Sequence, residues 1–143
     1  MSQIKVNSIV PAGGLPAGAN GGIIQVKQAL VNTTVSASCG SATTFTNISG
    51  MEVAITPSSS SNKILLYYTV NYGNSTADRN DLLRITRNAS VISDIIGSGG
   101  SVANGNALAR LSTNQQIICH SNMMLDSPGT TSEVIYRLHE TGS

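Results

Sequence analysis

Hydrophobic and polar positions alternate in short runs along most of this chain, and the strongest run is residues 63–72, K-I-L-L-Y-Y-T-V-N-Y. Its even-numbered positions are all apolar or aromatic. Its odd-numbered positions are apolar or aromatic at 65 and 67 and become polar at 69 and 71. β-Branched and aromatic residues with a period of two are typical of a strand rather than a helix. Because both faces are apolar near the start, we expect a central strand of the core that is covered on both sides.

Similar runs predict further strands between stretches rich in Gly, Pro, Ser and Asn. Together with 63–72, the predicted strands are residues 23–31, 44–48, 51–56, 82–87, 107–111, 115–125 and 133–138. Residues 33–38 are a candidate continuation of the first strand, and residues 91–96 fit a strand and a single helical turn equally well. No run predicts a helix of ten or more residues. The pattern therefore predicts an all-β chain of eight or nine strands, forming a single antiparallel β-sandwich or jelly roll.

The first 22 residues differ from the rest and are predicted to form an extended N-terminal arm, with the β-sandwich domain at residues 23–143. Residues 2–10 alternate like a short strand, but residues 11–22 contain two prolines and five glycines, which do not support a regular element. An extended arm can add a strand to the sheet of a neighbouring protein. We expect its partner contacts at the apolar and proline positions Ile4, Val6, Ile9, Pro11, Leu15 and Pro16.

Composition narrows the possible partners. Only 10% of the residues are charged and 40% are hydrophobic, and the formal net charge is +1. Without a basic stripe, electrostatic binding of nucleic acid is not expected. No apolar run approaches the roughly 20 residues that span a bilayer, so no membrane partner is expected either. Few charges, with many hydroxyl and amide side chains, favour an all-β protein that packs against other subunits.

In so uncharged a chain, the arginines of the predicted strands are expected to pair with Asp or Glu, either internally or across a subunit boundary. The candidate subunit-interface residues are Tyr67, Arg84, Arg87, Tyr136 and Arg137. Met123 and Met124 fit core packing best and a contact surface second.

The sequence offers no enzymatic motif, and we expect neither a cofactor nor a metal site. His120 and His139 lie outside any H-x-H or H-E-x-x-H spacing, and the glycine-rich residues 97–105 lack the Lys of a phosphate-binding loop. Cys39 and Cys119 can pair only if the fold brings their α-carbons within roughly 7 Å. Free, buried thiols are the expectation, and the pairing stays open.

Three segments resemble a family of small virion proteins found in tailed phages, especially those of cyanobacteria and marine bacteria. They are I-K-V-N-S-I-V-P-A-G-G-L-P-A-G-A-N-G-G-I-I-Q-V-K-Q at 4–28, T-F-T-N-I-S-G-M-E-V-A-I-T-P-S-S-S-S-N-K-I-L-L at 44–66, and L-D-S-P-G-T-T-S-E-V-I-Y-R-L at 125–138. The resemblance implies a trimeric β-sandwich or jelly roll that serves as a head decoration (cement) protein or as a tail-fibre or receptor-binding tip. It brings no catalytic motif, and its N-terminal arm corresponds to residues 2–22 here.

The leading hypothesis is a trimeric capsid decoration protein that stabilises the phage head by binding the major capsid protein through its N-terminal arm. It would be made in the host cytoplasm and lie on the outer capsid surface. The alternative is a tail-fibre or receptor-binding tip that contacts host surface glycan, although the absence of Trp disfavours sugar stacking. Hundreds of copies per particle would indicate the head, and a few dozen the tail.

Overall fold

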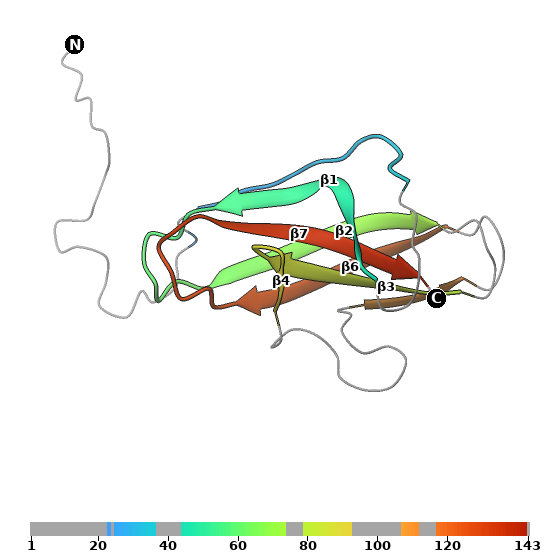
Figure 1. Cartoon of the computed structure of the whole chain (residues 1–143). Coiled ribbons are helices and arrows are strands. Elements are labelled where there is room, and N and C mark those ends of the chain that lie inside the picture. The colour runs from blue at the N-terminus through green and yellow to red at the C-terminus, as the bar shows by residue number, and fades with distance from the viewer. Residues whose placement is uncertain are drawn as a thin grey trace, which may run out of the picture.

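The computed structural model describes residue 23 and residues 25–36, 44–73, 79–92, 107–111 and 117–142. Within these ranges the chain forms strands and no helix, which confirms the all-β prediction. The strands make two antiparallel sheets that pack on a shared core (Figure 1).

The larger sheet has five strands and the smaller has two. In the larger sheet the order is β1–β7–β3–β4, with β5 also paired to β3. Its strands are β1 (Thr46–Ile55), β3 (Arg79–Arg87), β4 (Ser90–Val91), β5 (Ala107–Leu111) and β7 (Val134–Gly142). The smaller sheet consists of β2 (Ile64–Gly73) and β6 (Ile117–Asp126), which pair in one continuous register from Ile64↔Asp126 to Gly73↔Ile117.

Most of the predicted strands are confirmed, with shifted ends, and three expectations are wrong. The two strands expected at 44–48 and 51–56 are one strand, β1, whose register shifts between Asn47 and Glu52. Gly50 lies inside this irregularity with a φ of +80°, so the predicted break is a β-bulge within one strand and not a turn between two strands. Residues 25–31 are extended but belong to no strand. In the segment 91–96, for which the sequence fitted a strand and a helical turn equally well, Val91 belongs to β4. Residues 93–96 lie outside the described residues.

The third wrong expectation concerns β2, which is neither central nor covered on both sides. Within the described residues β2 pairs only with β6. Ile64 and Leu66 are buried, but the alternate side chains Leu65 and Tyr67 are 59% and 66% exposed. Only one face of this strand therefore lies in the core.

The hydrophobic core lies between the two sheets. Strand β2 contributes from the smaller sheet, while β3 and β7 contribute from the middle of the larger one. The buried cluster is Ile48, Ile64, Leu66, Leu83, Ile85, Ile92, Val134, Tyr136 and Leu138. Met124 of β6 packs against this cluster, in agreement with a core role, whereas Met123 is exposed.

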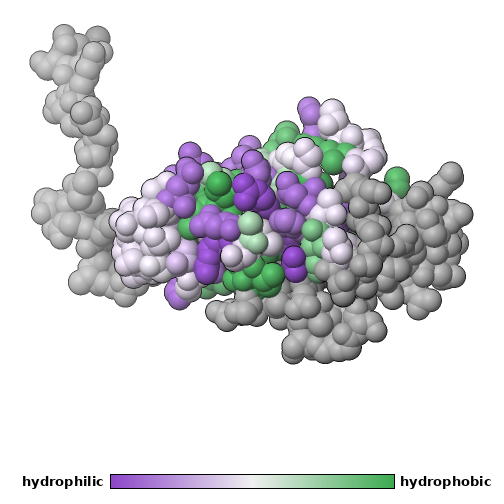
Figure 2. All heavy atoms as spheres, viewed as in Figure 1, coloured by the Kyte–Doolittle hydropathy of each residue, from purple (hydrophilic) through white to green (hydrophobic). Residues whose placement is uncertain are grey.

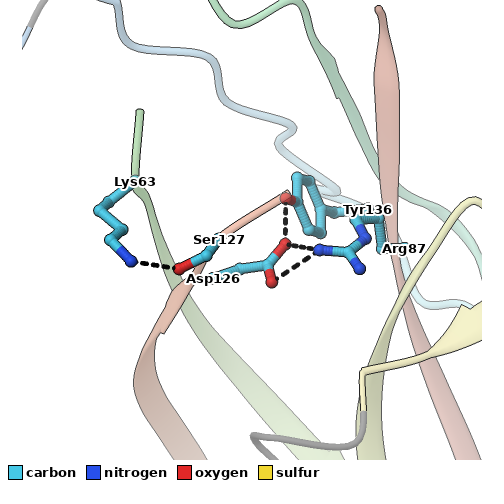
Figure 3. A network of polar contacts seen from close by, with 5 residues as sticks. All are labelled: Lys63, Arg87, Asp126, Ser127 and Tyr136. Carbon is cyan, nitrogen blue, oxygen red and sulfur yellow. Dashed lines mark hydrogen bonds and ion pairs between the residues drawn. The ribbon is translucent and has the colours of Figure 1, made fainter. Parts of the chain in front are cut away.

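A polar network also joins the two sheets through the core (Figure 3). Asp126, at the end of β6, is only 5% exposed. Its carboxylate accepts hydrogen bonds from Arg87 Nη1 at 2.9 Å and from the Tyr136 hydroxyl at 2.5 Å. Burial and the neighbouring carboxylate of Asp126 raise the pKa of Tyr136, so the phenol stays a donor. A buried charge with this many partners fixes how the sheets align.

Candidate interaction surface

Residues 25–36 form a segment along the upper edge of the molecule in Figure 1, which is extended as far as a bend at Thr33. One side of the segment is anchored, because Val35 packs against the core and Val31 lies close to Gly50 of β1. On the other side, Val26 and Leu30 are 74% and 82% exposed. Figure 2 shows hydrophobic surface along this edge. The segment is thus held through Val31 and Val35 and leaves the apolar side chains of Val26 and Leu30 exposed.

The outward face of the smaller sheet is also apolar at the end near the 57–62 turn. Leu65 of β2 lies opposite Leu125 of β6, and Tyr67 lies opposite Met123. All four side chains are exposed. An antiparallel sheet with one solvated face normally carries polar residues there. Two adjacent cross-strand apolar pairs make a contiguous patch, which is characteristic of an interaction surface.

The segment and this patch border the same hollow, which has a volume of about 1200 Å³. Its walls come from the segment, from β1 through Met51, Val53 and Ile55, and from the first half of β2. The 57–62 turn and residues of β3, β6 and β7, including the core residues Ile85 and Leu138, complete the lining. Six of the nine large hydrophobic residues that are exposed within the described ranges line it. They are Ile23, Val26, Leu30, Leu65, Tyr67 and Leu125. Exposed apolar surface is therefore concentrated at one place on the molecule.

Unpaired backbone accompanies the apolar side chains. Among the described residues, no backbone hydrogen bond joins the segment 25–36 to a strand. In the same part of the chain, β2 has one neighbour, β6, so its opposite edge is open. Proteins usually protect such edges with charges, prolines or bulges. β2 contains no charged residue and no proline, and its pairing with β6 shows no bulge. Along residues 64–69, which line the hollow, nothing in the described part of the chain protects this edge.

The predicted interface residues are placed very differently from one another. Tyr67 is exposed and lines the hollow. Arg87 pairs with Asp126 and Arg137 with Glu52, which confirms the expectation of ion pairs. Arg84 instead lies over the ring of Phe45, 3.7 Å from its centroid.

Tyr136, the fifth of these residues, is buried against Asp126. Tyr67 is thus the candidate that the geometry best presents to a neighbour, and an interface role for all five residues stays a prediction. The predicted arm contacts, from Ile4 to Pro16, lie outside the described residues.

Sequence reasoning missed Val26, Leu30, Leu65 and Leu125 as surface residues. The signal was present in part, because residues 63–72 are apolar on both faces, and this pattern was interpreted as double burial. A strand with two apolar faces can be covered by its own chain or by another one. The hydrophobic pattern alone does not separate these cases.

Two other titratable side chains, His139 and Tyr68, have shifted pKa values. His139 Nε2 lies 3.1 Å from Thr86 Oγ1. Burial, followed by the charges of Arg84 and Arg137, lowers the pKa of His139. Burial raises the pKa of Tyr68 to about 12, and its ring stacks on His120 with centroids 6.0 Å apart. Cys119 is a free thiol as expected, but it is exposed rather than buried. Cys39 lies outside the described residues.

In the described ranges, no group of three or more His, Cys, Asp or Glu side chains is placed to hold a metal ion. These ranges also contain no helix with the length and hydrophobicity to cross a membrane. Comparisons of the chain with protein-family models, curated proteins and solved structures found no match.

Proposed function

We propose that this chain is a structural protein of a phage particle, a trimeric decoration (cement) subunit with a jelly-roll domain on the outer surface of the head. The observation that carries the proposal is the hollow between the segment 25–36 and β2, where apolar side chains and unpaired backbone meet. Such a surface is costly to leave in water and is explained by burial against another subunit. The resemblance of three segments to small phage virion proteins supports the same conclusion.

The proposal divides the work between two parts of the chain. The β-sheet domain associates with copies of itself through the hollow. The arm, residues 1–22, binds the major capsid protein by adding its backbone and apolar side chains to a neighbouring sheet. Twenty residues reach on the order of 60–70 Å when extended, which is enough to connect adjacent capsid subunits. With only 10% of its residues charged, the protein would adhere mainly through apolar contacts and backbone hydrogen bonds.

The experiment is a binding assay with phage heads that lack the protein. The full chain and a chain without residues 1–22 are each incubated with the heads, and the bound protein is quantified after sedimentation. We expect saturable binding of the full chain at hundreds of copies per head. The truncated chain should remain a folded trimer and lose binding.

Three results would contradict the cement function. They are equal binding by the truncated protein, absence of binding by the full chain, and copy numbers of a few dozen in whole particles. The last result would favour the tail-fibre alternative, which binding of the isolated protein to host cells would then support.

A further inference from the structure

The proposed self-association leaves open which parts of two copies meet. We propose that residues 25–36 of one copy pair along the open edge of β2 in a second copy, which extends the two-stranded sheet and fills the hollow. This inference rests on the proposed assembly and specifies its interface. It commits to a second copy of this chain, because the chain itself carries both halves of the contact.

The first half is the segment. Residues 25–32 run in extended form up to a bend at Thr33, and among the described residues their backbone has no strand partner. At about 3.3 Å per residue these residues span about 26 Å, enough to follow residues 64–69 of β2. The segment's only charged residue is Lys27, so little desolvation of charge opposes its burial.

The second half is the edge of β2, which faces the hollow through residues 64–69. A segment that pairs there would satisfy the free N–H and C=O groups of β2. It would also bring Val26 and Leu30 close to Leu65 and Tyr67, and both sets of side chains are exposed in the single chain. Pairing and apolar burial would then occur together, as in other cases of strand addition.

The segment's own β2 is a poorer partner than that of a second copy. Val35 in the core and the contact of Val31 with Gly50 hold the segment on the β1 side of the hollow. The side that carries Val26 and Leu30 is the one left free. A segment that keeps its anchors can therefore join a neighbour without unfolding its own domain. Each copy then gives one segment and receives another, and such a head-to-tail contact forms a ring when the rotation that relates neighbouring copies closes on itself.

The test is disulfide crosslinking between two differently tagged full-length chains in a background of Cys39→Ser and Cys119→Ser. One chain carries Val26→Cys and the other Tyr67→Cys, and the mixture is refolded together and oxidised. We expect a crosslinked heterodimer as the main product. Exchanging Tyr67→Cys for Glu133→Cys, which is exposed and does not line the hollow, should abolish it. Equal crosslinking by the Glu133→Cys chain, or none by the Tyr67→Cys chain, would overturn the inference.

A second variant pair keeps this test separate from that of the proposed function. Leu30→Asp places a charge on the paired segment, and Thr33→Asp places one on an exposed residue of the same segment that does not line the hollow. We expect Leu30→Asp to raise the concentration needed for assembly at least tenfold, and Thr33→Asp to change it less than about twofold. A stable trimer that neither variant affects, without the crosslink, would refute this interface alone. A full chain that stays monomeric would refute the assembly as well.

Discussion

Two regions of the molecule invert the usual distribution of side chains. One is the polar network between the two sheets, and the other is the apolar hollow at the edge of β2. In the network, Asp126 is buried but receives hydrogen bonds from Arg87 and Tyr136. At the hollow, Leu65 and Leu30 are apolar but exposed. The buried charge is satisfied within one chain, whereas the exposed hydrophobic residues are not. On the proposed assembly, one chain completes the core by itself, and a second copy completes the β2 edge.

The largest effect is expected from removing the buried carboxylate. Asp126→Ala leaves Arg87 and the hydroxyl of Tyr136 without their common acceptor, so we expect a loss of about 3 kcal/mol in unfolding free energy. Urea denaturation measures it. Glu52→Ala is the matched control, because it removes the exposed partner of Arg137 and should cost at most about 1 kcal/mol. Equal losses for the two variants would contradict the role given to burial.

Substitutions of the adjacent residues Leu65 and Leu66 compare the hollow with the core within one strand, β2. Leu66 lies in the core, so Leu66→Ala should lower the unfolding free energy by about 2–3 kcal/mol. Leu65 is exposed, so Leu65→Ala should change folding by less than about 0.5 kcal/mol while weakening assembly. Denaturation in the Leu30→Asp background keeps association from adding to stability. Equal destabilisation by both substitutions would show that the chain buries Leu65 itself.

Smaller changes in stability, one in each direction, are expected from substitutions in two turns next to strands of the network. Ala89 has a φ of +64° in the β3–β4 turn, and Gly129 has a φ of +65° between β6 and β7. Positive φ disfavours a side chain, so Ala89→Gly should stabilise the fold by up to about 1 kcal/mol. Gly129→Ala should destabilise it by a similar amount through its positive φ alone, because a methyl group there would meet no atom within 4 Å and would neither clash nor pack. Thermal unfolding of both variants checks the signs, and two shifts of the same sign would be inconsistent with this explanation.

A dependence on pH is expected from His139. Its pKa is lowered in the folded chain by burial and by the charges of Arg84 and Arg137, so the unfolded chain binds the proton more readily. Stability should therefore fall as pH decreases below about 6.5, the ordinary value, and continue to fall down to the folded pKa. Denaturation midpoints between pH 5 and 8 measure the effect. His139→Gln should flatten the profile in this range, and an unchanged slope would assign it to other groups.

The sequence predicted the all-β class and the approximate positions of most strands, because period-two patterns are local. It did not predict the network, since Asp126 and Arg87 are 39 positions apart and only the strand order brings them together. The predicted break between residues 48 and 51 is a bulge inside β1, because glycine occurs in turns and bulges alike. The hollow was missed for a different reason. Leu65 has the same side chain whether its own chain or a neighbour covers it, so the local pattern contained no information on that choice.

The most direct test of the central claim is the mass of the full-length chain in solution, measured by sedimentation equilibrium across a range of concentrations. If second copies complete the β2 edge, the chain should sediment as a species of three 14.8 kDa chains, and Leu30→Asp should shift it towards one. A wild-type chain that sediments as a single 14.8 kDa species at every concentration would contradict the claim.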